Sequence, residues 1–362
     1  MLRLTSKILL FPYYALLKMR HFFYDRGIIK SSSYLVPVVS VGNVAVGGTG
    51  KTPHCEMIIR ELQKRGRVAL LSRGYGRATK GFRYVEPQDD YTLCGDEPLQ
   101  IKRKFPDTTV AVCERRCAGV ERLMREVAPE LILLDDALQH RKIRPLRSIV
   151  LINYNNPPYK DNLLPIGRLR DLPERIYSAD AVIVTNLPFR ADIEEDSDSL
   201  SMRDYAETLE MEWRERLKLP ERIAIYFSIV KYLEPEPLFP ECCDMRYKYS
   251  KAAFLFTAIA DDRAIYQYAK LHYTVVGREK FADHKDFSAS NLAKLNRAAA
   301  QHPLASLLTT EKDAQRLLSA RCSKVLSAEV KSRLFYLPIK VEIIHNKERL
   351  FEDLASLLPN AH

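Results

Sequence analysis

The stretch "VGNVAVGGTGKTPH", residues 41–54, decides the fold of this chain. It directly follows an apolar run, residues 36–41, that is typical of a buried strand. The glycines of the stretch let the backbone turn sharply and present several N–H groups at one point. A helix that begins after them adds the partial positive charge of its N-terminus. A strand, a glycine-rich loop, Lys51, Thr52 and a helix follow one another in the order of a P-loop, which binds nucleotide phosphates.

Eight residues of this loop are assigned to the nucleotide. We expect Lys51 to reach the β- and γ-phosphates and the Thr52 hydroxyl to ligate Mg²⁺. The strict P-loop pattern has glycine where this chain has Ala45, which weakens the match but still allows the turn. The assigned residues are Ala45, Val46, Gly47, Gly48, Thr49, Gly50, Lys51 and Thr52.

A pair of adjacent carboxylates supplies the acidic partner that a P-loop needs. In "LILLDDALQH", residues 131–140, four apolar residues place Asp135 and Asp136 at the C-terminal end of a strand. Open α/β sheets bind their ligands at this edge. Two neighbouring carboxylates are costly to bring together unless a cation lies beside them. We therefore predict that one of this pair, Asp135 or Asp136, holds Mg²⁺ directly or through water.

The net charge of +10 indicates an anionic partner, such as a nucleotide, a nucleic acid or an acidic membrane surface. The first 30 residues contain six Lys or Arg and one acidic residue, and residues 8–24 are rich in Leu, Tyr and Phe. A short amphipathic helix of this composition suits a membrane interface. It is equally compatible with a helix packed on the neighbouring domain. The apolar run ends at Lys18, too short to cross a bilayer.

Apolar runs alternate with helical segments along most of the chain, which predicts a mostly parallel sheet. We expect an α/β fold: a P-loop NTPase-like parallel sheet with helices on both faces, a second smaller α/β lobe, and an N-terminal amphipathic membrane-associating helix. Strands of the first lobe are predicted at 38–41, 68–71, 109–112, 131–134, 149–152 and 181–184. The predicted parts are the N-terminal helix (1–30), the P-loop domain (31–225), a linker (226–250) and the C-terminal lobe (251–362).

Two further clusters follow predicted strands. "LSRGYGR", residues 71–77, suits a loop that approaches a ligand, because it combines glycines, a tyrosine and arginines at a strand end. "CGDEPLQ", residues 94–100, places Asp96 and Glu97 before a proline-started helix. Asp96 has two interpretations. It is either an N-cap, which spacing alone favours, or a carboxylate that accepts the proton of an attacking hydroxyl.

Taken together, these motifs resemble the tetraacyldisaccharide 4′-kinases, the lipid A 4′-kinase (LpxK) family of Gram-negative bacteria. The matching stretches are "VGNVAVGGTGKTP", "SRGYGR", "GDEP", "DDALQH", "LLPIGRLRD", "FADH" and "TTEKDA". The resemblance implies a kinase that uses ATP and Mg²⁺ to phosphorylate the 4′-hydroxyl of a tetraacyldisaccharide 1-phosphate in lipid A biosynthesis. It also implies two α/β/α lobes and an N-terminal helix on the cytoplasmic face of the inner membrane, as a peripheral or monotopic protein. We expect a monomer that binds no nucleic acid.

The resemblance also implies residue roles. The catalytic carboxylate corresponds to Asp96 and its histidine partner to His284, with Lys51 at the phosphates and Asp135 and Asp136 at the metal. The residues assigned to the acceptor lipid are Arg73, Tyr75, Glu97, Arg116, Gln139, His140, Arg170 and Asp171. The chain departs from the family pattern at three positions, where it has Ala137 for glycine, Arg168 for proline and Asp171 for glutamate. The carboxylate of Asp171 is therefore one methylene shorter than that of the family's glutamate.

Two rival functions differ in class from a lipid kinase. The first is a P-loop GTPase or ATPase switch, because "TEKD", residues 310–313, resembles a guanine-reading motif with one extra residue. The second is a nucleic-acid-binding ATPase, which only the positive charge suggests, since no aromatic-basic or helix-turn-helix motif accompanies it. Lipid-dependent ATP turnover separates the kinase from both.

Overall fold

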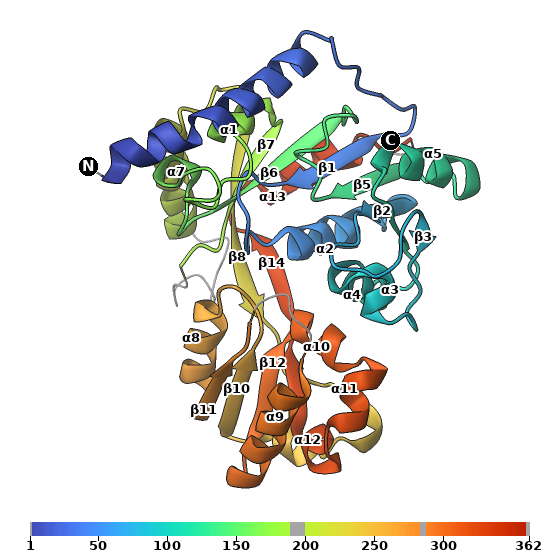
Figure 1. Cartoon of the computed structure of the whole chain (residues 1–362), viewed down its shortest axis with the longest axis vertical. Helices are drawn as coiled ribbons and strands as arrows, with labels where there is room; N and C mark the ends of the chain where they lie inside the picture. Colours follow the sequence, from blue (N-terminus) through green and yellow to red (C-terminus); the bar gives the residue numbers. More distant parts are fainter. Residues whose placement is uncertain (1, 189–199, 283–286, 360–362) are drawn as a thin grey trace.

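Two sheets organise the chain, a larger one in the first lobe and a smaller one in the second (Figure 1). The computed structural model describes residues 2–188, 200–282 and 287–359. The predicted α/β fold, with a mostly parallel sheet covered by helices on both faces, is confirmed. The strands predicted from apolar runs in the first lobe are all present, with bounds that differ by at most two residues.

The larger sheet has nine strands, and its seven inner strands are parallel. Its edge strands, β14 and β3, run antiparallel to their neighbours. In spatial order the strands are β14 (Ile339–Ile343), β8 (Ala224–Tyr232), β7 (Ala181–Thr185), β6 (Arg147–Asn153), β1 (Val38–Gly42), β5 (Leu131–Asp135), β2 (Val68–Ser72), β4 (Thr109–Val112) and β3 (Arg83–Tyr84).

Successive residues of the buried strands face opposite sides of the sheet, so each strand is apolar throughout and needs cover on both faces. Val39 and Val41 pack with α2 on one face, while Val38 packs with α5 on the other. The first face is covered by α2 (Lys51–Leu62), α4 (Asp96–Lys104) and α13 (Lys347–Ala355). The second is covered by α1 (Leu2–Asp25), α5 (Arg116–Glu126) and α7 (Leu200–Leu217). A short helix, α3 (Tyr91–Cys94), precedes α4.

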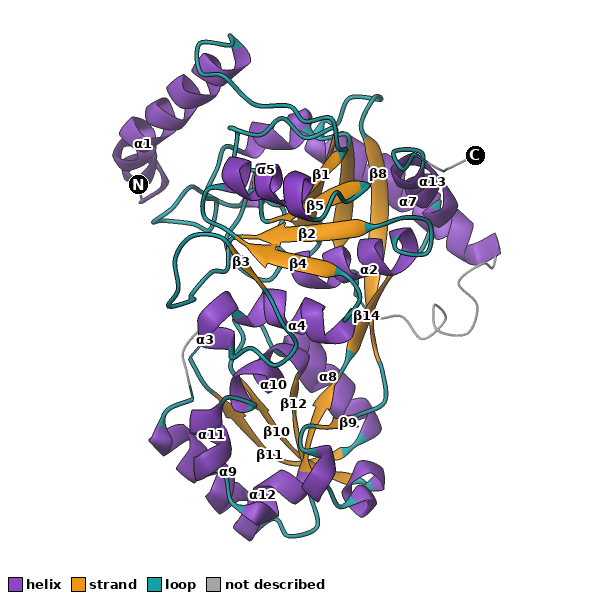
Figure 2. Ribbon diagram, turned by 90° about the vertical axis from the view of Figure 1, so that its right-hand side faces the viewer, coloured by secondary structure: helices purple, strands orange, loops and turns teal. Residues whose placement is uncertain are grey.

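The chain crosses between the lobes twice, along β8 and β14, which pair with each other (Figures 1 and 2). β8 lies mostly within the stretch predicted as a linker, and β14 and α13 lie within the stretch predicted as the C-terminal lobe. All three elements instead belong to the first lobe. Val341 of β14 and Leu354 of α13 are buried in the same hydrophobic core as Val41 of β1. The apolar faces of β14 and α13 therefore pack on the larger sheet.

The second lobe holds a five-stranded sheet of four parallel strands and one antiparallel edge strand. Its strands are, in spatial order, β11 (Thr274–Lys280), β10 (Ala252–Thr257), β12 (Ser306–Thr310), β13 (Leu334–Leu337) and β9 (Glu236–Pro237). One face is covered by α8 (Arg263–His272). The other is covered by α9 (Ala289–Gln301), α10 (Glu311–Leu317), α11 (Ala320–Val325) and α12 (Ala328–Arg333). Helix α10 faces the first lobe and contacts α4.

Candidate active site

The carboxyl ends of β1, β2 and β5 lie side by side at one edge of the larger sheet. Val41 on β1 is paired with Asp135 on β5, and β2 pairs with the other side of β5. The loops that leave these strands are the P-loop, the "SRGYGR" loop and the "DDALQH" loop. Parallel pairing therefore brings together three motifs that are distant in sequence, at the edge where α/β sheets bind ligands.

The P-loop, residues 42–50, leads from β1 into α2, whose first residues are Lys51 and Thr52. Gly50 has φ 78°, a left-handed conformation that glycine adopts without strain. The Asn43 amide donates to Thr49 Oγ1 over 2.7 Å. The His54 ring contacts Gly50 O through Nδ1 (2.7 Å) and the Ser228 hydroxyl through Nε2 (2.9 Å). These contacts fix the loop before any ligand arrives.

Lys51 and Asp136 meet at the mouth of this loop. Lys51 Nζ lies 3.8 Å from Asp136 Oδ1. Asp136 has φ 50°, a left-handed backbone conformation that costs free energy in residues other than glycine. Arg170 donates to both oxygens of the same carboxylate. Burial alone would raise the pKa of Asp136, but the hydrogen bond from Arg170 and the charge of Lys51 lower it below its ordinary value.

Asp135 has a different environment, although it is adjacent. Its side chain is buried and accepts a hydrogen bond from Ser72 Oγ over 3.0 Å. Burial, followed by the negative charges of Glu97 and Asp136, raises the pKa of Asp135 to about 6. A cation bound beside this carboxyl group would stabilise its ionised form.

Asp96 and Glu97 form the first turn of α4 and face the second lobe. The N-cap position of α4 is Gly95, so the capping interpretation of Asp96 does not describe this helix. Lys312 of α10 places Nζ 2.9 Å from Glu97 Oε1, and Arg316 Nε lies 3.9 Å from Asp96 Oδ2. Burial works against the ionised form of Glu97, but Lys312 and Lys51 outweigh it and lower the pKa.

Several residues assigned to the acceptor lie around the same edge. The Gln139 amide donates to Asn43 O over 2.8 Å. Burial and the positive charges of Arg116 and Lys142 lower the pKa of His140 to about 4. Arg116 is itself buried and donates to the main-chain oxygen of Asp135 over 3.2 Å.

Arg73 and Tyr75 are exposed on the loop after β2.

Arg170 and Asp171 differ sharply in position. Arg170 connects two motifs, since it donates to Asp136 and also to Asn43 Oδ1, over 2.5 Å. Asp171 is fully buried and pairs with His21 of α1, so its side chain has no surface for a ligand in this structure. His284, predicted as a catalytic partner, lies outside the described residues.

Sequence reasoning left out residues that support this site. Asn43 directly follows a buried strand inside the P-loop motif, and His54 closes the same motif, so both had a positional signal. Lys312 and Arg316 lie in or just after "TTEKDA", but nothing local shows that they cross to the other lobe. The cavity beside the P-loop, about 440 Å³, is lined on its far side by Ala260, Asp261, Asp262, Arg263 and Lys280 of the second lobe.

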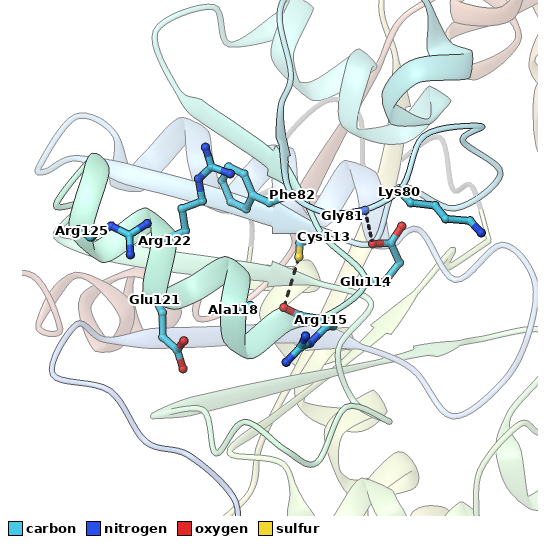
Figure 3. A pocket seen from close by; sticks show the side chains of 10 residues that line it. All are labelled: Lys80, Gly81, Phe82, Cys113, Glu114, Arg115, Ala118, Glu121, Arg122 and Arg125. Atoms are coloured by element: carbon cyan, nitrogen blue, oxygen red, sulfur yellow. Dashed lines mark hydrogen bonds between the residues drawn. The ribbon is translucent and has the colours of Figure 1, made fainter.

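A second cavity, of about 720 Å³, lies beside α5 (Figure 3). Lys80, Arg115, Arg122 and Arg125 give its lining a mainly basic character. Glu114, which also lines it, accepts from the Gly81 amide over 3.0 Å. No P-loop residue lines this cavity, so we do not place the nucleotide there.

Comparison with known proteins decides the family. The family model described as tetraacyldisaccharide-1-P 4'-kinase matches residues 3–359. The chain belongs to this family. It is 36% identical over 343 residues to the tetraacyldisaccharide 4'-kinase of Bacteroides fragilis strain YCH46, covering 92% of this chain and 87% of that protein. It is 35% identical over 352 residues to that of Flavobacterium johnsoniae, with 96% and 95% covered.

A solved structure of the same family shares the architecture over the whole chain. The crystal structure of "apo" form LpxK from Aquifex aeolicus in complex with ATP superposes with a TM-score of 0.73 at 26% sequence identity. The superposition covers 99% of this chain and 100% of that one. The recognition of the family from its motifs is therefore confirmed.

Proposed function

We propose that this chain transfers the γ-phosphoryl group of ATP to the 4′-hydroxyl of a tetraacyldisaccharide 1-phosphate, giving a bisphosphorylated lipid A precursor (lipid IVA). The observation that carries this proposal is the 3.8 Å approach of Lys51 Nζ to Asp136 at the end of the P-loop. This contact supports the assignment of Lys51 to the phosphates and of Asp136 to the metal. The relatives named tetraacyldisaccharide 4'-kinase supply the identity of the acceptor.

The nucleotide phosphates would lie on the loop amides and the N-terminus of α2, with Lys51 neutralising charge on the β- and γ-phosphates. Mg²⁺ usually takes only one or two protein carboxylates together with substrate phosphates. Asp135, Asp136 and the Thr52 hydroxyl fit that donor set. Within the described ranges, no three His, Cys, Asp or Glu side chains cluster as metal ligands. When bound, Mg²⁺ would supply further charge neutralisation.

Asp96 is the group that we assign to the acceptor hydroxyl. The 4′-oxygen attacks the γ-phosphorus and forms the new P–O bond while the bond to the β-phosphate oxygen breaks, and ADP leaves. The hydroxyl proton passes to the Asp96 carboxylate. The guanidinium of Arg316 lies beside this carboxylate, with Nε 3.9 Å from Asp96 Oδ2. His284 remains a proposed partner of Asp96.

The acceptor is an amphiphile, so the enzyme must reach a lipid surface. Helix α1 exposes Phe11, Leu16, Met19 and Phe22 next to the cationic Lys18. We propose that this surface lies on the cytoplasmic face of the inner membrane, because apolar side chains beside cations suit an anionic interface. No described helix combines the length and apolarity needed to cross a bilayer.

The switch-protein alternative finds no support at "TEKD". Lys312 pairs with Glu97, while Asp313 is buried and accepts from the Ala258 amide over 3.0 Å. Both side chains of the supposed base-reading motif are therefore already engaged.

The decisive test is incubation of the purified protein with labelled ATP and a disaccharide 1-phosphate lipid, followed by chromatography. We expect a labelled bisphosphorylated product that requires Mg²⁺ and disappears in Lys51→Ala. Hydrolysis of ATP or GTP without labelled lipid would contradict the proposal and favour the switch protein.

A further inference from the structure

Helix α1 contacts both loops that shape the carboxylate side of the site. Arg20 donates to the main-chain oxygen of Gln139 over 2.7 Å. Arg141, two residues further along the same loop, donates to the main-chain oxygen of His21 over 3.0 Å. On the other side, His21 reaches Asp171, next to Arg170. The helix thus joins the loop that follows Asp136 to the loop that contains Arg170.

The proton on His21 can be located from its partners. Arg141 NH1 lies 3.2 Å from His21 Nδ1, and a guanidinium only donates hydrogen bonds. Nδ1 must therefore accept, which leaves the ring proton on Nε2. Nε2 lies 2.6 Å from Asp171 Oδ1 and donates to it. His21 is 6% exposed, so this contact lies inside the protein.

The contact with His21 stabilises the ionised form of the buried Asp171 carboxylate. Its Oδ1 also accepts from the Leu172 amide over 2.9 Å, whereas its Oδ2 has no hydrogen-bond partner among the described residues. Burial would raise the pKa of Asp171, but the hydrogen bond from His21 lowers it. A buried carboxylate that loses its side-chain donor is strongly destabilised and moves or takes up a proton.

Any movement of Asp171 would reach the active site through the preceding residue, Arg170. Arg170 NH1 donates to Asp136 Oδ2 over 2.9 Å, and NH2 donates to Asn43 Oδ1. The amides of Arg170 and Asp171 both donate to Val44 O, at 2.9 Å and 3.3 Å. Arg170 and Asp171 thus contact Val44 and Asn43 of the P-loop and the predicted metal carboxylate Asp136.

We propose that His21 is a positioning residue: through Asp171 it holds Arg170 on Asp136, so that α1 is part of the active-site scaffold as well as a membrane contact. This inference rests on the proposed function, because it takes the transfer reaction as its readout. It gives the first helix a role that persists when no membrane is present.

The test uses the full-length protein with a detergent-dispersed acceptor, which removes the need for membrane docking. For His21→Ala we expect kcat to fall by about 10–100-fold, the usual cost of losing a partner that orients a metal-binding group. The KM for the dispersed lipid should change little. The Mg²⁺-dependent part of ATP affinity, measured by equilibrium dialysis, should weaken as well. His21→Gln places an amide donor near Nε2 and should recover most of the rate.

Two further variants keep the test decisive. Asp25→Asn removes an exposed partner of Arg141 on the same helix and should stay within about twofold of the parent, as exposed ion pairs contribute little. His21→Phe fills the space without a donor and replaces the alanine variant if that does not fold. A kcat within twofold of the parent for His21→Ala or His21→Phe, or a loss confined to vesicle-bound acceptor, would overturn the inference. A parent protein that binds Mg·ATP but makes no product would instead refute the proposed function, and dialysis would still test His21.

Discussion

The two sides of this active site are built in different ways. On the sheet side, Lys51, Asp135 and Asp136 follow strands of a single sheet, and their partners lie in the same lobe. On the lobe side, Asp96 and Glu97 of the first lobe meet Arg316 and Lys312 of the second across the gap between the lobes. The sheet side is therefore fixed by folding, whereas the lobe side exists only in one relative position of the lobes.

This difference suggests which step each side controls. Phosphate binding needs a preformed, rigid cradle, and the sheet side has one in the contacts of Asn43 and His54. Proton transfer from the acceptor needs water to be excluded at the moment of reaction, which closure of two lobes provides. We infer that the nucleotide can bind to the sheet side alone, and that transfer requires both sides.

Lys51→Ala tests the sheet side and should have the largest effect. A cation that stabilises charge on a transferring phosphoryl group is worth about 10³-fold or more in kcat. We expect a loss of that size together with weaker ATP binding, measured by initial rates and by equilibrium dialysis. Lys64→Ala, an exposed lysine just past the end of the same helix, is the matched control. Unchanged nucleotide affinity in Lys51→Ala would mean that the P-loop does not hold the phosphates.

Asp96→Asn separates the two sides. The amide keeps the shape of the side chain but cannot take up a proton, so kcat should fall by about 10²–10³-fold. ATP affinity should stay near that of the parent, because Asp96 lies on the lobe side. Asp107→Asn, an exposed aspartate shortly after the same helix, should behave as the parent. Near-normal turnover in Asp96→Asn would remove Asp96 from catalysis.

The two sides also differ in how far the sequence could predict them. Lys51, Asp135 and Asp136 each follow a continuous apolar run, and parallel strands end at the same edge, so their meeting was predictable. The strands of the first lobe were predictable for the same reason. β14 and α13 were assigned to the wrong lobe. The sequence of an apolar strand or an amphipathic helix shows that one of its faces is buried, but it does not show which sheet that face packs on.

Contacts between segments that are far apart in the chain could not be predicted from the local sequence pattern. Lys312 is 215 residues from Glu97, and His21 is 150 residues from Asp171. Asp171 was expected to bind the acceptor, yet it is fully buried against α1. A charged residue in a motif marks a constrained position, but only tertiary packing decides whether it faces a ligand or a neighbouring helix.

Lys312→Met tests the lobe side with a smaller effect. Methionine keeps the apolar stem of lysine but loses the charge that pairs with Glu97. We expect kcat to fall by about tenfold, the cost of roughly one partly buried charge-assisted hydrogen bond. ATP affinity should change little. Lys294→Met, which breaks a more exposed pair with Glu279 in the second lobe, is the control. Equal losses in both variants would show that any charge removal disturbs this lobe, and the cross-lobe pair would have no special role.

The smallest expected effect comes from a second contact between the lobes, in which one lysine forms ion pairs with two carboxylates. Lys104 Nζ lies 2.8 Å from Glu311 Oε1 and 2.7 Å from Glu56 Oε2. Burial, followed by the charge of Glu56, raises the pKa of Glu311 to about 7. The folded protein therefore holds a proton on Glu311 that the unfolded chain loses near pH 4.5, the ordinary value.

Because the folded state binds this proton more tightly, the stabilisation is present below about pH 4.5 and is lost as the pH rises through about 7. Glu311→Gln keeps an acceptor for Lys104 but cannot ionise. It should therefore gain free energy of unfolding over the parent between pH 5 and pH 8, by at least roughly 1 kcal/mol, since one unit of pKa shift corresponds to about 1.4 kcal/mol. Urea titrations at the two pH values measure this difference, with Glu352→Gln, exposed on α13, as the control. If the parent and Glu311→Gln showed the same pH dependence, the raised pKa of Glu311 would be refuted, and the contact between Lys104 and Glu311 would carry no pH-dependent part of the stability.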